Sequence, residues 1–271
     1  PDMIGQASWA SVQRGAVAPN GEMWFSTWGD ANSGIYRYNP AVDANASTQF
    51  FIGTRASSGL ITNNGGEVGC STPGIAIYSA GKDSKLYLIG EDFSAGSTKG
   101  SLAIYNIGNE DGSIVTSWDK APTAHYNTLT DRDGTNFAMA ATPYGVWICQ
   151  NRAKAANIAG ARSLQFIGND GVQRFLSLDD ALFNGSYGAG VVTNAAYDKL
   201  WMVNGDGDIQ QFSVAWSEGS DPTPSLTLDA TYATPFGAIS QMTFDYAGNI
   251  VAVGGTGATP YSNNASVLSL A

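Results

Sequence analysis

Two short segments carry the oxygen-rich side chains that could bind a metal ion. Residues 131–136 (DRDGTN) and 204–208 (NGDGD) place oxygen-bearing side chains at alternating positions next to glycine. Calcium takes about six to eight oxygen ligands, and the glutamate that would complete such a loop is missing after both segments. Tight hairpin turns require the same Gly-rich composition. We therefore predict turns at both places, and neither a metal site nor a cofactor. Calcium binding at these segments is the alternative.

Three carboxylates, Asp30, Glu91 and Asp92, are candidates for acid–base catalysis because they stand where apolar, β-prone runs give way to loops. Glycoside hydrolysis needs two carboxyl groups that face each other across the scissile bond. Carboxylates in loops are usually solvated, however. The one histidine, His125, lies in an expected polar loop, and no Gly-x-Ser-x-Gly segment supports a serine hydrolase. We therefore assign no catalytic residue, and the enzyme hypothesis stays open.

The composition excludes several classes of protein and of partner. Among 271 residues only 13% are charged while 11% are aromatic, which excludes a disordered chain or a coiled coil. Thirteen basic residues are scattered along a chain of net charge −10, so nucleic acid is excluded as a partner. No apolar run is long enough to predict a transmembrane segment. The acidic balance is typical of secreted proteins, so we expect an extracellular or cell-surface location, with the periplasm as the alternative.

The two cysteines, Cys70 and Cys149, are too few for a disulfide framework. Cys149 stands in the apolar run 146–149, which predicts a buried thiol that packs as a small hydrophobic side chain. A disulfide between the two is the alternative.

A repeat of about 50 to 63 residues sets the expected fold. Its clearest unit is a turn signal followed by an apolar, β-prone run, and it recurs at residues 20–25, 83–88, 144–148, 197–202 and 247–252. A strand rich in small residues precedes each unit, at 15–18, 74–78, 137–140, 190–193 and 239–244. A third strand follows at 34–38, 101–105, 163–167, 209–213 and 266–270, and a fourth in four repeats at 48–52, 114–118, 172–176 and 225–228.

These units of four antiparallel strands resemble the blades of a β-propeller. In each repeat a turn that contains Gly, Asn or Asp is followed by an apolar run. This order is similar to the repeats of NHL and SMP-30-like propellers, and of propeller modules in secreted bacterial proteins. The resemblance implies an all-β, five-bladed propeller that spans residues 1–271 as a single domain. An SMP-30-like lactonase would bind its metal through Glu, Asn and Asp near the central channel. The first inner strand here has Arg14 and Gly15 and no glutamate, which argues against that activity.

The fifth repeat ends after its third strand. We expect residues 3–8 at the N-terminus to supply its fourth strand and so close the ring, because closure removes exposed sheet edges. The alternative is a propeller of six blades, one of which is missing from this sequence.

Loop lengths indicate where a ligand would bind. The loops that join strand two to strand three, and strand four to the next blade, are generally longer than those on the opposite face, and binding residues concentrate in such loops. Off-repeat aromatic side chains and a few charged ones fall in them. We therefore predict a ligand site at the mouth of the channel on this face, lined by Trp28, Arg55, Asp92, Arg152 and Tyr187.

Two functions remain open at this point. The first is a non-catalytic, extracellular or cell-surface binding or scaffold module whose ligand is a small molecule, a glycan or a protein. The second is a propeller enzyme, of the glycoside hydrolase or lactonase kind, acting on a carbohydrate or a lactone. Convergence of at least two carboxylates across a pocket would distinguish the enzyme.

Overall fold

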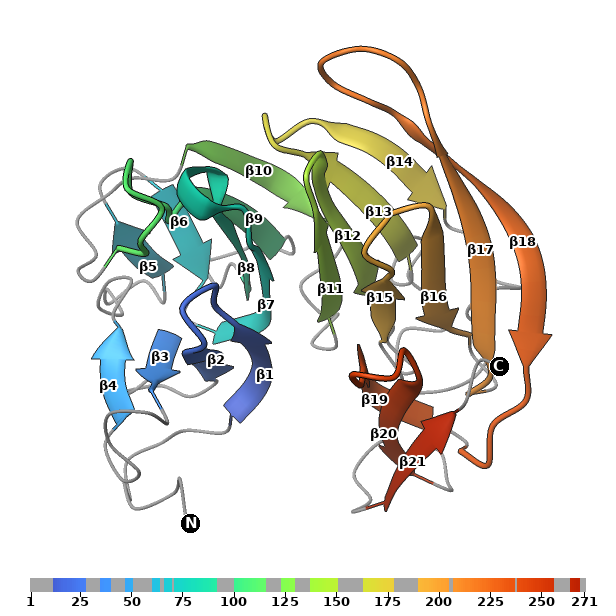
Figure 1. Cartoon of the computed structure of the whole chain (residues 1–271). Coiled ribbons are helices and arrows are strands. Elements are labelled where there is room, and N and C mark those ends of the chain that lie inside the picture. The colour runs from blue at the N-terminus through green and yellow to red at the C-terminus, as the bar shows by residue number, and fades with distance from the viewer. Residues whose placement is uncertain are drawn as a thin grey trace. The chain divides into compact units, whose positions relative to one another are not determined.

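The chain divides into two compact units, residues 1–132 with 169–171 and residues 133–168 with 172–271. Both consist of antiparallel β-sheets (Figure 1). The computed structural model describes residues 12–27, 35–39, 47–50, 60–63, 66–69, 71–91, 100–115, 123–129, 137–150, 163–177, 190–204, 207–236, 238–255 and 264–268.

Among its described residues, the first unit contains two four-stranded sheets and a two-stranded hairpin. One sheet has the strand order β1-β2-β3-β4 and the other β10-β9-β8-β7, while β5 pairs with β6. The elements are β1 (Val12–Val17), β2 (Met23–Thr27), β3 (Ile35–Tyr38), β4 (Ser47–Phe50), β5 (Leu60–Asn63), β6 (Gly66–Gly69), β7 (Ser71–Tyr78), the 3-10 helix η1 (Gly81–Asp83), β8 (Lys85–Glu91), β9 (Gly100–Asn106) and β10 (Ala124–Leu129).

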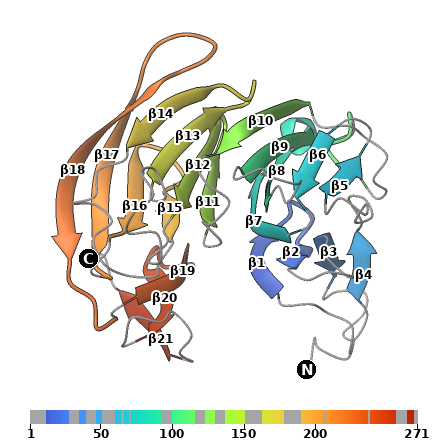
Figure 2. The same ribbon diagram turned by 180° about the vertical axis from the view of Figure 1, so that it is seen from behind.

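The described part of the second unit contains two four-stranded sheets and one of three strands, which Figure 2 shows from behind. Their strand orders are β11-β12-β13-β14, β15-β16-β17-β18 and β19-β20-β21. The strands are β11 (Phe137–Thr142), β12 (Gly145–Gln150), β13 (Ser163–Gly168), β14 (Gln173–Ser177), β15 (Val191–Thr193), β16 (Lys199–Val203), β17 (Ile209–Trp216), β18 (Pro224–Tyr232), β19 (Ala238–Phe244), β20 (Ile250–Gly255) and β21 (Asn264–Leu268).

Consecutive strands are hydrogen-bonded neighbours in each of these sheets. The connections from strand one to two and from three to four therefore lie at one end of a sheet, here called its turn end. The connection from strand two to three lies at the opposite end, the loop end. Gly145 shows how tight a turn end is. Its φ is 153°, and a Cβ at this position would collide with the carbonyl oxygen of Ile167.

The core of the first unit lies between its four-stranded sheets. Trp24 of β2 belongs to the same buried cluster as Leu86 and Leu88 of β8 and Tyr105 of β9. Burial raises the pKa of the Tyr105 hydroxyl far above its ordinary value, because the charged phenolate is poorly solvated there. All four residues from Leu86 to Ile89 are fully buried, so β8 is covered on both faces of its sheet.

Among the described residues of the second unit, two buried clusters lie one on each face of the sheet β15–β18. Leu200 and Phe212 pack with Trp147 and Phe166 of the sheet β11–β14. Trp201, on the opposite face of β16, packs with residues of β19 and β20, and its ring meets that of Phe244 at 5.3 Å and 81°. Trp24, Trp147 and Trp201, which stand at the same position of their repeats, are all buried.

Most of the strands predicted from the sequence are present, and three local predictions are wrong. The strand predicted at residues 114–118 is wrong in its described part, because Ile114 and Val115 belong to no strand and β10 is the fourth strand that pairs with β9. Ile114 makes only an isolated bridge to Gly108 and is buried with Val115 in the core cluster. His125 accordingly lies in a strand and not in a polar loop. The expected long loop after residue 54 contains the hairpin of β5 and β6.

The predicted N-terminal strand, residues 3–8, lies outside the described residues, so closure of the ring by this segment stays a prediction. The three-stranded sheet β19-β20-β21 has no fourth strand among the residues that the structure describes.

Candidate functional site

The five residues predicted to line a ligand site fall in connections that the structure does not describe. Trp28, Arg55, Asp92, Arg152 and Tyr187 all lie outside the described ranges, as does the candidate carboxylate Asp30. Glu91 is the last residue of β8. The prediction of a site at the loop end therefore stays a prediction.

One of the two oxygen-rich segments is partly described, and it forms a turn. Asn204 accepts a hydrogen bond from the backbone of Asp208 on its Oδ1 at 2.9 Å, and the two residues also pair through their backbones. The carboxylate of Asp208 accepts from the Thr234 amide at 3.2 Å. These oxygens stabilise the hairpin between β16 and β17. No cluster of potential metal ligands occurs among the described residues, and residues 131–136 are not among them.

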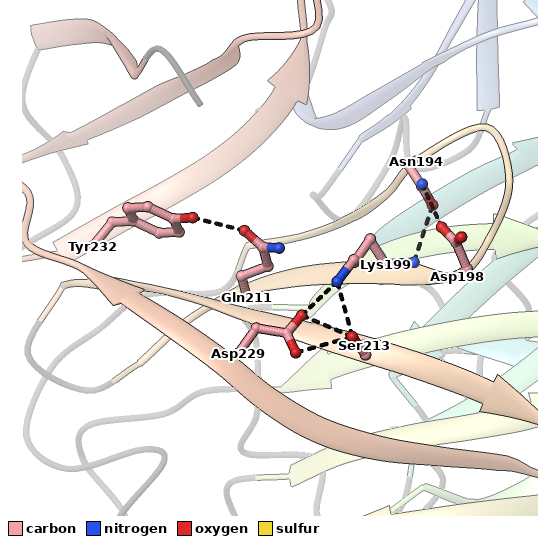
Figure 3. A network of polar contacts seen from close by, with 7 residues as sticks. All are labelled: Asn194, Asp198, Lys199, Gln211, Ser213, Asp229 and Tyr232. Carbon is pink, nitrogen blue, oxygen red and sulfur yellow. Dashed lines mark hydrogen bonds and ion pairs between the residues drawn. The ribbon is translucent and has the colours of Figure 1, made fainter. Parts of the chain in front are cut away.

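A polar cluster joins three strands of the sheet β15–β18 (Figure 3). Lys199 on β16 donates from Nζ to Asp229 on β18 at 2.7 Å and to Ser213 on β17 at 2.8 Å. Ser213 in turn donates to both carboxylate oxygens of Asp229 at 2.9 Å. The pairing of β17 with β18 slips by one residue at Asp229, which is a β-bulge. The bulge directs Asp229 toward the two side chains that it binds.

The cluster of Lys199, Ser213 and Asp229, here called the brace, suits a structural role that holds three strands together. It suits a nucleophilic role for Ser213 less well. In a Ser–Lys nucleophile the amine accepts the hydroxyl proton, whereas here Lys199 donates to Ser213. Hydrogen bonds from Lys199 first, and then from Ser213, lower the pKa of Asp229 below its ordinary value. The charged carboxylate is therefore the form that this cluster stabilises.

Two further side-chain pairs extend the polar surface around this brace (Figure 3). Tyr232 donates from its hydroxyl to Gln211 at 2.7 Å, which ties the end of β18 to β17. Asn194 donates to Asp198 at 2.6 Å and accepts from the Lys199 amide at 3.1 Å, which closes the turn between β15 and β16. Sequence reasoning missed the brace, because a bulge that aligns Asp229 with Ser213 depends on the pairing register.

An aromatic cluster lies at the turn ends of the sheets β11–β14 and β15–β18. Trp216, the last residue of β17, has its ring 5.0 Å from Phe166, 6.3 Å from Trp147 and 4.8 Å from Tyr144. The ring of Phe175 also packs against Trp147, edge to face, with the centroids 5.5 Å apart. Phe166 and Trp147 are fully buried, whereas Tyr144 is 39% exposed. The cluster thus runs from the core to the surface.

Trp216 is held in place by an unusual turn. Its indole Nε1 donates to the backbone carbonyl of Tyr197 at 2.8 Å. Tyr197 has φ = 58°, the one non-glycine residue with positive φ in the described chain, and its turn position is that of Gly248 in the next sheet. Sequence reasoning missed Trp216. The available signal was that it is a tryptophan outside the repeated position occupied by Trp147 and Trp201.

Comparison with solved structures identifies the architecture. The chain is similar to the gluconolactonase XC5397 from Xanthomonas campestris, with a TM-score of 0.52 and 14% sequence identity over 91% of this chain and 70% of that one. The β-propeller domain of Cps50 (Swd1) from Myceliophteria thermophila matches with a TM-score of 0.47 and 11% identity, over 89% of this chain and 66% of that one. No protein-family model matches the sequence, and no curated protein matches it significantly.

The antiparallel sheets of three and four strands, together with the likeness to the gluconolactonase, define the class: the protein is a β-propeller. Identity this low shows the fold alone. Within the described residues, no helix has the length and apolarity to cross a membrane.

Proposed function

We propose that the protein is a non-catalytic binding or scaffold module, extracellular or at the cell surface, that takes a carbohydrate or a protein at the loop ends of its sheets. One observation supports this most directly: in four of the five described sheets of three or four strands, the connection from strand two to three is longer than the one from strand one to two. Turn-end connections between strands three and four such as residues 107–123 are an exception to this difference between the ends. At the turn end, residues 143–144, 194–198 and 245–249 link strands one and two. At the loop end, residues 92–99, 151–162 and 256–263 link strands two and three. Long connections on a rigid sheet are where binding residues concentrate.

The described carboxylates support binding over catalysis. Asp245 accepts from the backbone of Ala247 and Asn249, Asp111 holds the turn at Ser113, and Asp229 belongs to the brace. Each is an acceptor within the fold and stabilises a turn or a strand pairing. An acid–base pair would instead have two carboxyl groups directed at one substrate.

The competing proposal is an enzyme that acts on a carbohydrate or a lactone. The similarity to a gluconolactonase is the observation in its favour, and that similarity is one of fold. Arg14 and Gly15 on β1, the first strand of the sheet β1–β4, leave that strand without the glutamate that the lactonase resemblance requires. We therefore rank this function second.

A glycan array probed with the full chain, together with a lactone-hydrolysis assay, tests the two proposals. We expect glycan binding that falls at least tenfold in affinity in Trp28→Ala and in Tyr187→Ala. Tyr246→Ala is the matched control, because Tyr246 is a fully exposed tyrosine at a turn end. Turnover of an aldonolactone with calcium or zinc would establish the enzyme instead. A bound glycan whose affinity neither variant changes would contradict the loop-end site.

A further inference from the structure

We propose that the turn ends of the sheets β11–β14 and β15–β18 form a second binding site, a carbohydrate platform made by Tyr144 and Trp216. The site is separate from the loop-end connections and does not depend on the function proposed for them. Tyr144 is the surface member of the pair, with its ring centroid 4.8 Å from that of Trp216 and the planes tilted by 55°.

Buried rings support the pair from below. Trp216 rests on Phe166 at 5.0 Å, edge to face, and Phe166 has no exposed surface. Aromatic pairs at such distances and angles attract each other beyond the burial of their area. An exposed ring backed in this way keeps its orientation without a ligand. A ligand that stacks on it therefore loses little free energy to ordering the site.

The backbone on both sides of the pair is also fixed. The Tyr144 amide donates to the hydroxyl of Thr142 at 3.2 Å, and that buried hydroxyl donates to the Gly145 carbonyl at 3.0 Å. On the other side, the Tyr197 carbonyl holds the Trp216 indole at 2.8 Å. The turn at Tyr197 adopts a conformation that costs free energy for a residue with a bulky side chain, yet it sets the direction of this carbonyl.

Two carboxylates whose side chains are held by neighbours belong to the connections that carry Trp216 and its partner Tyr197. Asp221, in the connection that follows Trp216, pairs with Arg174 at 3.5 Å, and its side chain is 59% exposed whereas that of Arg174 is only 12% exposed. Asp198, the neighbour of Tyr197, is fixed by Asn194 at 2.6 Å. Arg174 offsets the charge of Asp221 and leaves carboxylate oxygens at the surface.

This combination matches the chemistry of a sugar. A pyranose ring has a face of C–H groups that packs on an aromatic ring, and hydroxyls at its edge that donate to fixed oxygens. A cationic peptide would also be attracted by tyrosine and carboxylates. However, Asp221 already has the partly buried guanidinium of Arg174 as its partner, which weakens the pull on a second cation. The geometry therefore favours a neutral saccharide chain.

The test uses the full chain with soluble cello-, xylo-, manno-, malto- and chito-hexaoses, titrated by calorimetry and followed by tryptophan fluorescence. We expect at least one hexaose to bind, with an affinity that falls at least tenfold in Tyr144→Ala. Tyr144→Phe, which keeps the ring, should stay within twofold of the parent, and Tyr246→Ala should leave the affinity unchanged. Thermal unfolding of each variant verifies that it is folded.

Three results would overturn the platform. One is a hexaose whose affinity Tyr144→Ala does not change, and a second is the absence of binding by every hexaose. The third is binding of a lysine-rich peptide, at low salt, that Tyr144→Ala abolishes while the saccharides do not bind. One case of the first result separates the two proposals. If a hexaose loses affinity in Tyr187→Ala and not in Tyr144→Ala, the loop-end proposal holds and the platform is overturned.

Discussion

At the scale of single residues, the most informative side chain is Asp229. It lies at a bulge where one extra residue enters β18, and a bulge re-aims the side chain that it carries. The result is a carboxylate that accepts from both Lys199 and Ser213. An outermost strand with unpaired backbone groups is a risk for aggregation, and charged side chains on it reduce that risk. Asp229 thus binds β18 to its own sheet and makes its surface polar.

Asp229→Asn should lower the melting temperature at pH 7, by an amount that shrinks as the pH falls below about 4. Hydrogen bonds from Lys199 and Ser213 lower the pKa of Asp229 in the folded state. A group with a depressed pKa stabilises the fold above its unfolded pKa of about 4, and this contribution is lost as the pH falls through the folded value. Melting curves of parent and variant between pH 7 and pH 3 measure the difference. Glu218→Gln, at an exposed position in the connection between β17 and β18, is the control, and a difference that does not shrink between pH 7 and pH 3 would contradict the assignment.

At the scale of elements, the tight turns carry much of the specificity of the fold. Gly145→Ala should destabilise the protein by about 3 kcal/mol or more, because the new Cβ collides with the Ile167 carbonyl oxygen. Gly248→Ala should cost only about 1 kcal/mol, because Gly248 has φ = 81° but nothing within 4 Å of the added carbon. Denaturant unfolding of both variants measures the two losses. Equal losses would show that strain at φ, and not the collision, decides the cost.

The strands of this fold are largely predictable from the sequence, because each sheet repeats one pattern of turn and apolar run. The second strands, such as Leu86 to Ile89 in β8, are buried on both faces. Their continuous apolar sequence is the pattern that predicts such burial. The bounds at 163–168 and 209–216 agree with the prediction to within a few residues.

The outer strands are harder to predict, as the second sheet shows. Ile114 and Val115 are apolar and β-prone, so the sequence suggested a strand there, but they are buried by packing in the core and not by pairing. The strand that does pair, β10 (AHYNTL), is polar enough to resemble a loop. An outer strand is held by backbone hydrogen bonds along one edge, so its side chains can be polar. They therefore give little indication in the sequence of where the strand lies in the sheet.

The candidate sites are less predictable than the sheets, for a related reason. Trp147 shares its repeat position with Trp24 and Trp201, and all three are buried. The contact between Tyr144 and Trp216 joins residues from different sheets, and the brace depends on a shift in register at Asp229. Neither arrangement has a short-range pattern in the sequence. Only the three-dimensional pairing of the strands brings these residues together.

At the scale of the whole molecule, the unequal strand number of the sheets matters most. The four sheets made from the first four repeats each have four strands, whereas the described part of the last sheet has three. Its third strand, β21, therefore has an edge with no partner among the described residues. A propeller avoids such edges by closing its ring. Residues 3–8 are the segment that we predict to pair there.

Deletion of residues 1–9 tests this closure. Removing the segment should leave β21 exposed, lower the melting temperature by roughly 5 °C or more, and increase aggregation, because an open edge recruits other strands. Replacing the same residues with a Gly/Ser linker of equal length is the control for chain length and should be as harmful as the deletion. A synthetic peptide of residues 1–11 added to the deletion variant should restore part of the lost stability. If the deletion leaves the melting temperature unchanged, the N-terminal segment does not complete the last sheet, and the five-bladed arrangement closed by this strand is wrong.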